Sequence, residues 1–91
     1  MANNDLVPES KQWVVSNDPD TQAEQIVAWV NANGGLAQYE PKWTGTDATT
    51  ARIAVRSLND WAYASLGDYV VKDYSWVTVN GRSIRVFQVV H

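Results

Sequence analysis

One segment of the chain has apolar residues at helical spacing. Ala23, Ile26, Val27 and Val30 occupy positions i, i+3, i+4 and i+7, which form one face of an α-helix. The pattern therefore predicts a helix from about residue 20 to residue 32 that buries Ile26, Val27 and Val30. Trp29 lies beside this stripe, and we expect it either to flank the core or to be partly exposed.

The residues on either side of this stripe are typical of helix ends. Asp18 followed by Pro19 suits an N-cap and a first helical position, and residues 21–24 (Thr-Gln-Ala-Glu) match a capping box. Gly34 or Gly35 can adopt the left-handed conformation that often follows a helix. These signals favour the same helix as the apolar stripe.

Other apolar runs predict strands. Residues 11–15 form a short β-prone run, and residues 36–43 form another that contains Pro41. Because proline cannot donate to a β-ladder, we expect the second run to be an edge strand. In residues 51–58, Ile53 and Val55 alternate with polar or small residues, which is typical of a half-buried strand. Residues 61–66 indicate a further short strand after a turn at residues 59–60.

The last segment, residues 65–91, predicts a long β-hairpin. Asn80-Gly81 is a strong signal for a type I′ turn, in which both residues have positive φ. A two-residue loop pairs Val79 with Arg82, Val77 with Ile84, Ser75 with Val86 and Val71 with Val90, and on the other face it pairs Trp76 with Arg85 and Tyr74 with Phe87. We expect the aliphatic face to cover the helix. A bulge near Asp73 would exchange the two faces beyond it.

Together these elements predict an α+β fold. One helix would pack on a mostly antiparallel, twisted sheet of four to five strands that ends in a C-terminal β-hairpin. Residues 1–9 are polar and contain Pro8, so we expect a disordered N-terminal arm followed by a single domain over residues 10–91.

Composition narrows the possible chemistry. The 91 residues include no cysteine, and the only histidine is His91, so the sequence predicts no cofactor, metal site or enzymatic activity. No apolar run approaches the roughly 20 residues of a membrane span, and no signal peptide is evident, which predicts a cytoplasmic protein with no membrane partner. The net charge of −3 argues against nucleic acid. Five tryptophans are many for this length and indicate both core and binding roles.

Three stretches together resemble a known group of proteins. Ile26–Val30 lies on the predicted helix, residues 51–58 form an alternating strand, and Gly67-Asp68-Tyr69-Val70-Val71 leads into a hydrophobic strand. This arrangement is similar to small uncharacterised proteins of tailed bacteriophages, over roughly residues 13–75. The final segment of those proteins is replaced here by residues 75–91. The resemblance implies a phage origin, with the host cytoplasm as the place of action, and it implies no chemistry.

Some residues also match patterns of other functional classes. Asp60 and Asp68 flank an aromatic segment as a carboxylate pair would, but both also suit turns. Asp18, Asp20 and Glu24 lack the spacing of a calcium loop and suit a helix N-terminus. The remaining alternatives are single-stranded nucleic acid on strand arginines and aromatics, mimicry of DNA by the acidic half of the chain, and carbohydrate stacking on tryptophan.

The favoured prediction is protein binding through one face of the hairpin. Aromatic and arginine side chains are the usual anchors of protein interfaces. We expect Tyr74, Trp76, Arg85 and Phe87 to form an exposed partner-binding patch. The alternative is that this aromatic face is the core and the aliphatic face lies outside. The sequence thus predicts a small accessory protein that binds a host or phage protein. The alternative is a virion-associated or self-assembling structural protein, with a possible homo-oligomer.

Overall fold

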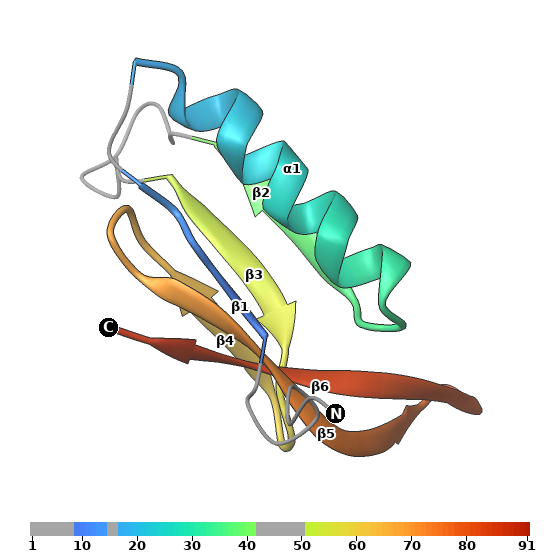
Figure 1. Cartoon of the computed structure of the whole chain (residues 1–91). Helices are drawn as coiled ribbons and strands as arrows, with labels where there is room; N and C mark the ends of the chain where they lie inside the picture. Colours follow the sequence, from blue (N-terminus) through green and yellow to red (C-terminus); the bar gives the residue numbers. More distant parts are fainter. Residues whose placement is uncertain (1–8, 15–16, 42–50) are drawn as a thin grey trace, which may run out of the picture.

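The structure is a computed structural model that describes residues 9–14, 17–41 and 51–91. It has an α+β fold with one helix and six strands in the described part of the chain, which confirms the predicted class and the C-terminal hairpin (Figure 1). The elements in chain order are β1 (Ser10–Gln12), α1 (Pro19–Ala32), β2 (Ala37–Glu40), β3 (Arg52–Arg56), β4 (Trp61–Ala64), β5 (Tyr69–Val79) and β6 (Arg82–Val90).

The strands divide between two antiparallel sheets, where the sequence predicted one sheet of four to five strands. One sheet has the order β1-β5-β6 and the other has the order β2-β3-β4. Figure 1 shows α1 alongside β2 and β3, with the β5–β6 hairpin crossing beneath and its turn projecting past the end of the helix. Periodicity identifies strands but does not specify which strands pair. β1 pairs with β5, from which it is separated by most of the sequence.

Helix α1 begins where the sequence predicted. Asp18 is the N-cap and its carboxylate accepts a hydrogen bond from the Thr21 backbone N–H at 3.1 Å, with Pro19 in the first turn. The Thr21 hydroxyl donates to the same carboxylate, and both bonds lower the pKa of Asp18. Thr21 therefore lies inside the helix and does not act as the N-cap of the predicted capping box.

The core lies between α1 and the two sheets. Ile26 and Val30 are buried as predicted, whereas Val27 is only partly buried at its margin. Trp13, just after β1, is fully buried, and its Nε1 donates to the Pro19 carbonyl oxygen at 3.0 Å. The main cluster contains Trp13, Ala23, Ile26, Val30, Ala37, Ile53, Val55, Ala64, Val70 and Phe87.

The second sheet follows the sequence pattern closely. β2 is an edge strand that ends directly before Pro41, as a residue without a backbone N–H requires. Ile53 and Val55 of β3 both enter the core. Residues 42–43, at the end of the predicted edge strand, lie outside the described residues.

The start of the chain is partly described. Of the predicted disordered arm, residues 1–8 lie outside the described residues. Glu9, the last residue of that predicted arm, is described and contacts Lys72. Its carbonyl oxygen accepts from the Lys72 backbone N–H at 2.8 Å, and its carboxylate pairs with Lys72 Nζ at 3.0 Å.

Candidate functional site

The hairpin turn has the predicted geometry. Asn80 has φ 52° and Gly81 has φ 80°, so both central residues adopt the positive φ of a type I′ turn. Val79 pairs with Arg82 and Trp76 pairs with Arg85, as the two-residue register requires. The sequence signal therefore places Trp76 opposite Arg85.

The pairing changes below Trp76. Lys72 pairs with Phe87, so three residues of β5 (73–75) lie opposite one residue of β6, Val86. This bulge makes three predicted pairs wrong, namely Tyr74–Phe87, Ser75–Val86 and Val71–Val90. Because two extra residues are inserted, the alternation of faces along the hairpin is preserved. We call residues 73–86, from the bulge through the turn, the hairpin tip.

Asp73 holds the bulge together. Its carboxylate accepts a hydrogen bond from the Ser75 backbone N–H at 2.9 Å and another from the Gln88 side-chain amide. The Ser75 bond is the main reason that the pKa of Asp73 is lower than its ordinary value. Its backbone carbonyl oxygen accepts from Arg85 Nη1 at 3.1 Å. One residue thus fixes both the backbone of the bulge and the guanidinium above it.

Arg85 and Trp76, which the predicted register pairs, form a cation–π contact. The guanidinium carbon lies 4.4 Å from the centroid of the Trp76 ring. Arg85 is partly buried, and its Nε is shielded without a hydrogen-bond partner among the described residues. Trp76 keeps 52% of its surface exposed, and so does Tyr74 on the bulge. An ordered, half-exposed aromatic surface therefore exists on the hairpin tip.

The hairpin tip contacts the residues that follow helix α1. Gly34, with φ 86°, accepts a hydrogen bond on its carbonyl oxygen from the Arg85 backbone N–H at 2.8 Å. A Cβ at Gly34 would lie 3.3 Å from the far edge of the Trp76 ring, so the indole rests against this glycine. The ring is therefore bounded by Gly34 at its edge and by Arg85 over its face.

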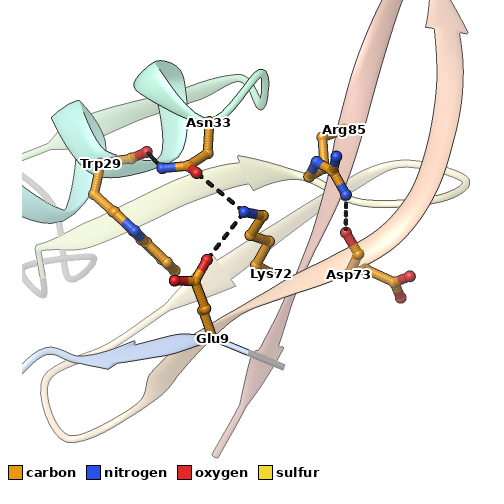
Figure 2. Close-up of polar contacts among 6 residues, drawn as sticks. All are labelled: Glu9, Trp29, Asn33, Lys72, Asp73 and Arg85. Carbon is orange, nitrogen blue, oxygen red and sulfur yellow. Dashed lines mark hydrogen bonds and ion pairs between the residues drawn. The ribbon is translucent and has the colours of Figure 1, made fainter. Parts of the chain in front are cut away.

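The Lys72 side chain also reaches the end of helix α1. Lys72 Nζ donates to Asn33 Oδ1 at 3.1 Å and to the Glu9 carboxylate, while the Asn33 side-chain amide donates to the Trp29 carbonyl oxygen (Figure 2). The last turn of α1 contains no basic residue of its own. Lys72 supplies positive charge there from β5, where the helix dipole favours it.

Phe87 is not part of the exposed patch, which corrects the prediction. It is fully buried and packs edge-to-face on Trp29, with ring centroids 5.3 Å apart. A Cβ at Gly35 would lie 2.5 Å from the Phe87 ring. The hairpin face that carries Trp76, Arg85 and Phe87 therefore points toward α1, whereas the aliphatic face was expected to do so.

The aliphatic face has a cover of its own. Ile84 and Val86 are buried outside the main core cluster, and β6 lies against β3 and β4. Val90, at the end of the same face, is half exposed. The separate β2-β3-β4 sheet therefore forms a second layer against the hairpin.

The other candidate residues have structural contacts. Asp60 accepts a hydrogen bond from the Trp61 backbone N–H at 2.7 Å. Asp68 is buried, accepts from the Ser65 backbone N–H at 2.8 Å and lies 2.7 Å from His91 Nδ1. Both carboxylates therefore stabilise turns. Within residues 9–14, 17–41 and 51–91, no group of three metal-ligating side chains occurs, and no helix there is long and apolar enough to cross a membrane.

Sequence reasoning identified Trp76, Arg85 and Tyr74 but missed their supports. Gly34 was predicted only as a residue that ends the helix. No local sequence pattern indicates that the Trp76 ring packs against it. Asp73 was noted as a possible bulge, and the short sequence Asp-Tyr-Ser, in which a carboxylate can bond the backbone two residues later, is the signal that indicates it. Lys72 reaches Asn33 only through tertiary packing.

Comparison with known proteins gives no relative. No protein-family model, curated protein or solved structure matches the chain.

Proposed function

We propose that this chain is a small, non-catalytic bacteriophage protein that binds a host or phage protein through the exposed part of its hairpin tip. The observation that carries the proposal is the half-exposed Trp76 ring, held in place by Gly34 and Arg85. Tryptophan and arginine are frequent energetic anchors of protein interfaces. A side chain that is ordered before binding loses less conformational entropy when the partner arrives.

The charge of the hairpin tip favours an acidic partner surface. Arg82 is exposed and Arg85 is partly exposed beside Trp76. The one acidic residue of the tip, Asp73, has its carboxylate engaged by Ser75 and Gln88. Complementary charge mainly increases the association rate and the specificity of such an interface.

The phage setting has a separate basis. It depends on the sequence resemblance of residues 13–75. The proposed location in the host cytoplasm and the proposed identity of the partner as a host or phage protein depend on the same resemblance. The binding mode depends on the hairpin tip. Evidence against the phage origin would therefore leave the binding mode untouched, and evidence against the binding mode would leave the phage origin untouched.

A capture experiment with matched baits tests the binding mode. The intact chain, the Tyr74→Ala chain and the Trp76→Ala/Arg85→Ala chain are immobilised and exposed to lysate of a bacterial host. Tyr69→Ala is the control, since Tyr69 is an exposed tyrosine on the same strand outside the hairpin tip. We expect one protein to be retained by the intact and Tyr69→Ala baits, to be lost on the tip variants, and to bind again when purified. Equal retention on all four folded baits would refute the hairpin tip as the site.

Self-assembly is a second candidate, and one observation favours it. Among the described residues, β1 pairs only with Tyr69–Val71 of β5, so the edge of β5 along the hairpin tip carries no neighbouring strand on that side. Open strand edges are templates for pairing with another chain. A discrete oligomer of the purified chain in size-exclusion chromatography with light scattering, lost in Trp76→Ala/Arg85→Ala, would favour this candidate over a heterologous partner.

A further inference from the structure

Among the residues that the structure describes, the strand β1 has no neighbouring strand on the side away from β5, which leaves that edge open. It is the outermost strand of its sheet, with Lys11 paired to Val70. The Lys72 N–H donates to the Glu9 carbonyl oxygen and the Trp13 N–H donates to the Asp68 carbonyl oxygen. Odd-numbered residues of this segment therefore direct their backbone groups toward β5. Because the groups alternate along a strand, Ser10 and Gln12 direct theirs toward the open edge.

A groove lies between this strand and helix α1. It has a volume of about 220 Å³ and is lined by Lys11 and Gln12 from β1 and by Gln22, Gln25, Ile26 and Trp29 from α1. This is smaller than the roughly 300–1,000 Å³ of pockets that enclose a whole small molecule. It suits the side chains and backbone of a short extended segment.

The walls of the groove carry polar groups suited to a peptide. Gln22 and Gln25 present side-chain amides, which match the donors and acceptors of a peptide backbone. Gln22 Oε1 is shielded and has no hydrogen-bond donor among the described residues.

Lys11 gives the groove a charge preference. Its Nζ lies 5.5 Å from the centroid of the Trp29 ring, and it forms no ion pair within the described residues. The acidic residue nearest in sequence, Glu9, is paired with Lys72. A ligand carboxylate beside Lys11 therefore meets an ammonium group with no competing acid in the described part of the chain.

We propose that this groove binds an extended peptide segment of a partner protein, which adds as a strand to the edge of β1 and places an acidic side chain beside Lys11. In strand addition, main-chain hydrogen bonds provide affinity and alternate side chains provide specificity. The Ser10 and Gln12 backbones make the main-chain bonds, and α1 forms the opposite wall. The site is separate from the hairpin tip and does not depend on the function proposed for it.

A random library of eight-residue peptides tests the proposal with the intact chain. After selection on the immobilised protein, the enriched peptides are synthesised and titrated into ¹⁵N-labelled protein. We expect the enriched peptides to share an Asp or Glu, and we expect the Ser10 and Gln12 amides to shift and become protected from hydrogen exchange. Lys11→Glu should weaken binding roughly tenfold and redirect selection toward Lys- or Arg-containing peptides.

Matched variants separate this site from others. Gln25→Glu adds a negative charge at an exposed helix position of the groove and should also weaken acidic peptides. Arg82→Glu makes the same charge change as Lys11→Glu on the hairpin tip and should leave peptide binding unaltered. The proposal is overturned if no peptide is enriched over a bovine serum albumin control, if basic peptides are preferred by the intact chain, or if the Ser10 and Gln12 amides do not respond. Protection of those amides that grows with protein concentration alone would instead identify a second copy of the chain as the occupant.

Discussion

The guanidinium of Arg85 lies 4.4 Å from the centre of the Trp76 ring, on the opposite strand of the hairpin. The same Arg85 donates its backbone N–H to Gly34 and its side-chain Nη1 to Asp73. One residue thus links the hairpin tip to the end of helix α1 while it orders an exposed indole. The arrangement explains how a tryptophan with half of its surface in water keeps a defined orientation.

The buried stripe of α1 supports the whole domain. Ile26 is almost fully buried between the helix and the sheets, so Ile26→Ala should lower the free energy of unfolding by about 2–5 kcal/mol through lost burial and a residual cavity. Val27→Ala, at the partly buried margin, should cost less. Urea denaturation followed by circular dichroism measures both. A loss below about 0.5 kcal/mol for Ile26→Ala would show that the stripe is not packed.

At Gly81 the turn requires a backbone with positive φ and does not require the absence of a side chain for reasons of space. This residue has φ 80°, and apart from Gly81 itself and its two chain neighbours no described atom lies within 4 Å of the position that a Cβ would occupy, so space does not limit substitution. Gly81→Val should nevertheless destabilise the hairpin, since a β-branched residue resists positive φ. D-alanine at the same position, introduced by chemical synthesis, should restore stability because it prefers positive φ. Equal unfolding midpoints for the glycine and valine chains would be incompatible with a turn at Asn80-Gly81.

Gly35 provides space for Phe87. A Cβ there would lie 2.5 Å from Phe87 Cε1 and 2.7 Å from Val30 Cγ1, which is too close for any side chain. Gly35→Ala should therefore cost about 1–3 kcal/mol through overpacking. In the Phe87→Leu background the same change should cost less, because the ring that it meets is gone. Strict additivity of the two substitutions in thermal denaturation would argue against this contact.

The bulge should respond to acid through Asp73. Its hydrogen bond from Ser75 lowers the pKa of the carboxyl in the folded chain below the ordinary value of 3.8. A carboxyl with a lower pKa in the folded state stabilises the fold above its ordinary pKa, and this contribution disappears as the pH falls through the folded-state pKa. We expect the Ser75 amide resonance to move over that acidic range as the bulge loosens.

The Asp73→Asn chain is the test of that assignment. Asparagine keeps a side-chain oxygen that can accept from Ser75 but does not titrate, so the acid transition of the Ser75 resonance should vanish. Asp60→Asn removes a carboxylate from a different turn and should leave the transition in place. A transition that persists in Asp73→Asn would assign it to another group.

Local patterns predicted the elements of this fold better than their assembly. The spacing of Ile26 and Val30 identified the helix, and Asn80-Gly81 identified the turn and the Trp76–Arg85 pair, because each signal lies within a few residues. The division into two sheets depends on pairing between β1 and β5, more than fifty residues apart, which no local pattern specifies.

The candidate site shows the same limit. Tyr74, Trp76 and Arg85 were identified from their residue types and register, and all three are at least partly exposed. Phe87 was assigned to the same surface because it shares their face, but its ring packs against Trp29 of α1 and against Gly35, which places it in the core. A hairpin face can thus be core at one end and surface at the other, depending on which element covers it.

Fluorine NMR of protein labelled with 5-fluorotryptophan tests the central claim most directly. The Trp76 resonance, assigned by its loss in Trp76→Phe, is followed while the captured partner, or the unlabelled chain itself, is added. We expect a sharp Trp76 resonance with a solvent isotope shift in the free monomer, which moves on association while the resonance of buried Trp13 stays fixed. A Trp76 resonance that lacks the isotope shift in the monomer, or that stays fixed when the complex forms, would contradict that claim.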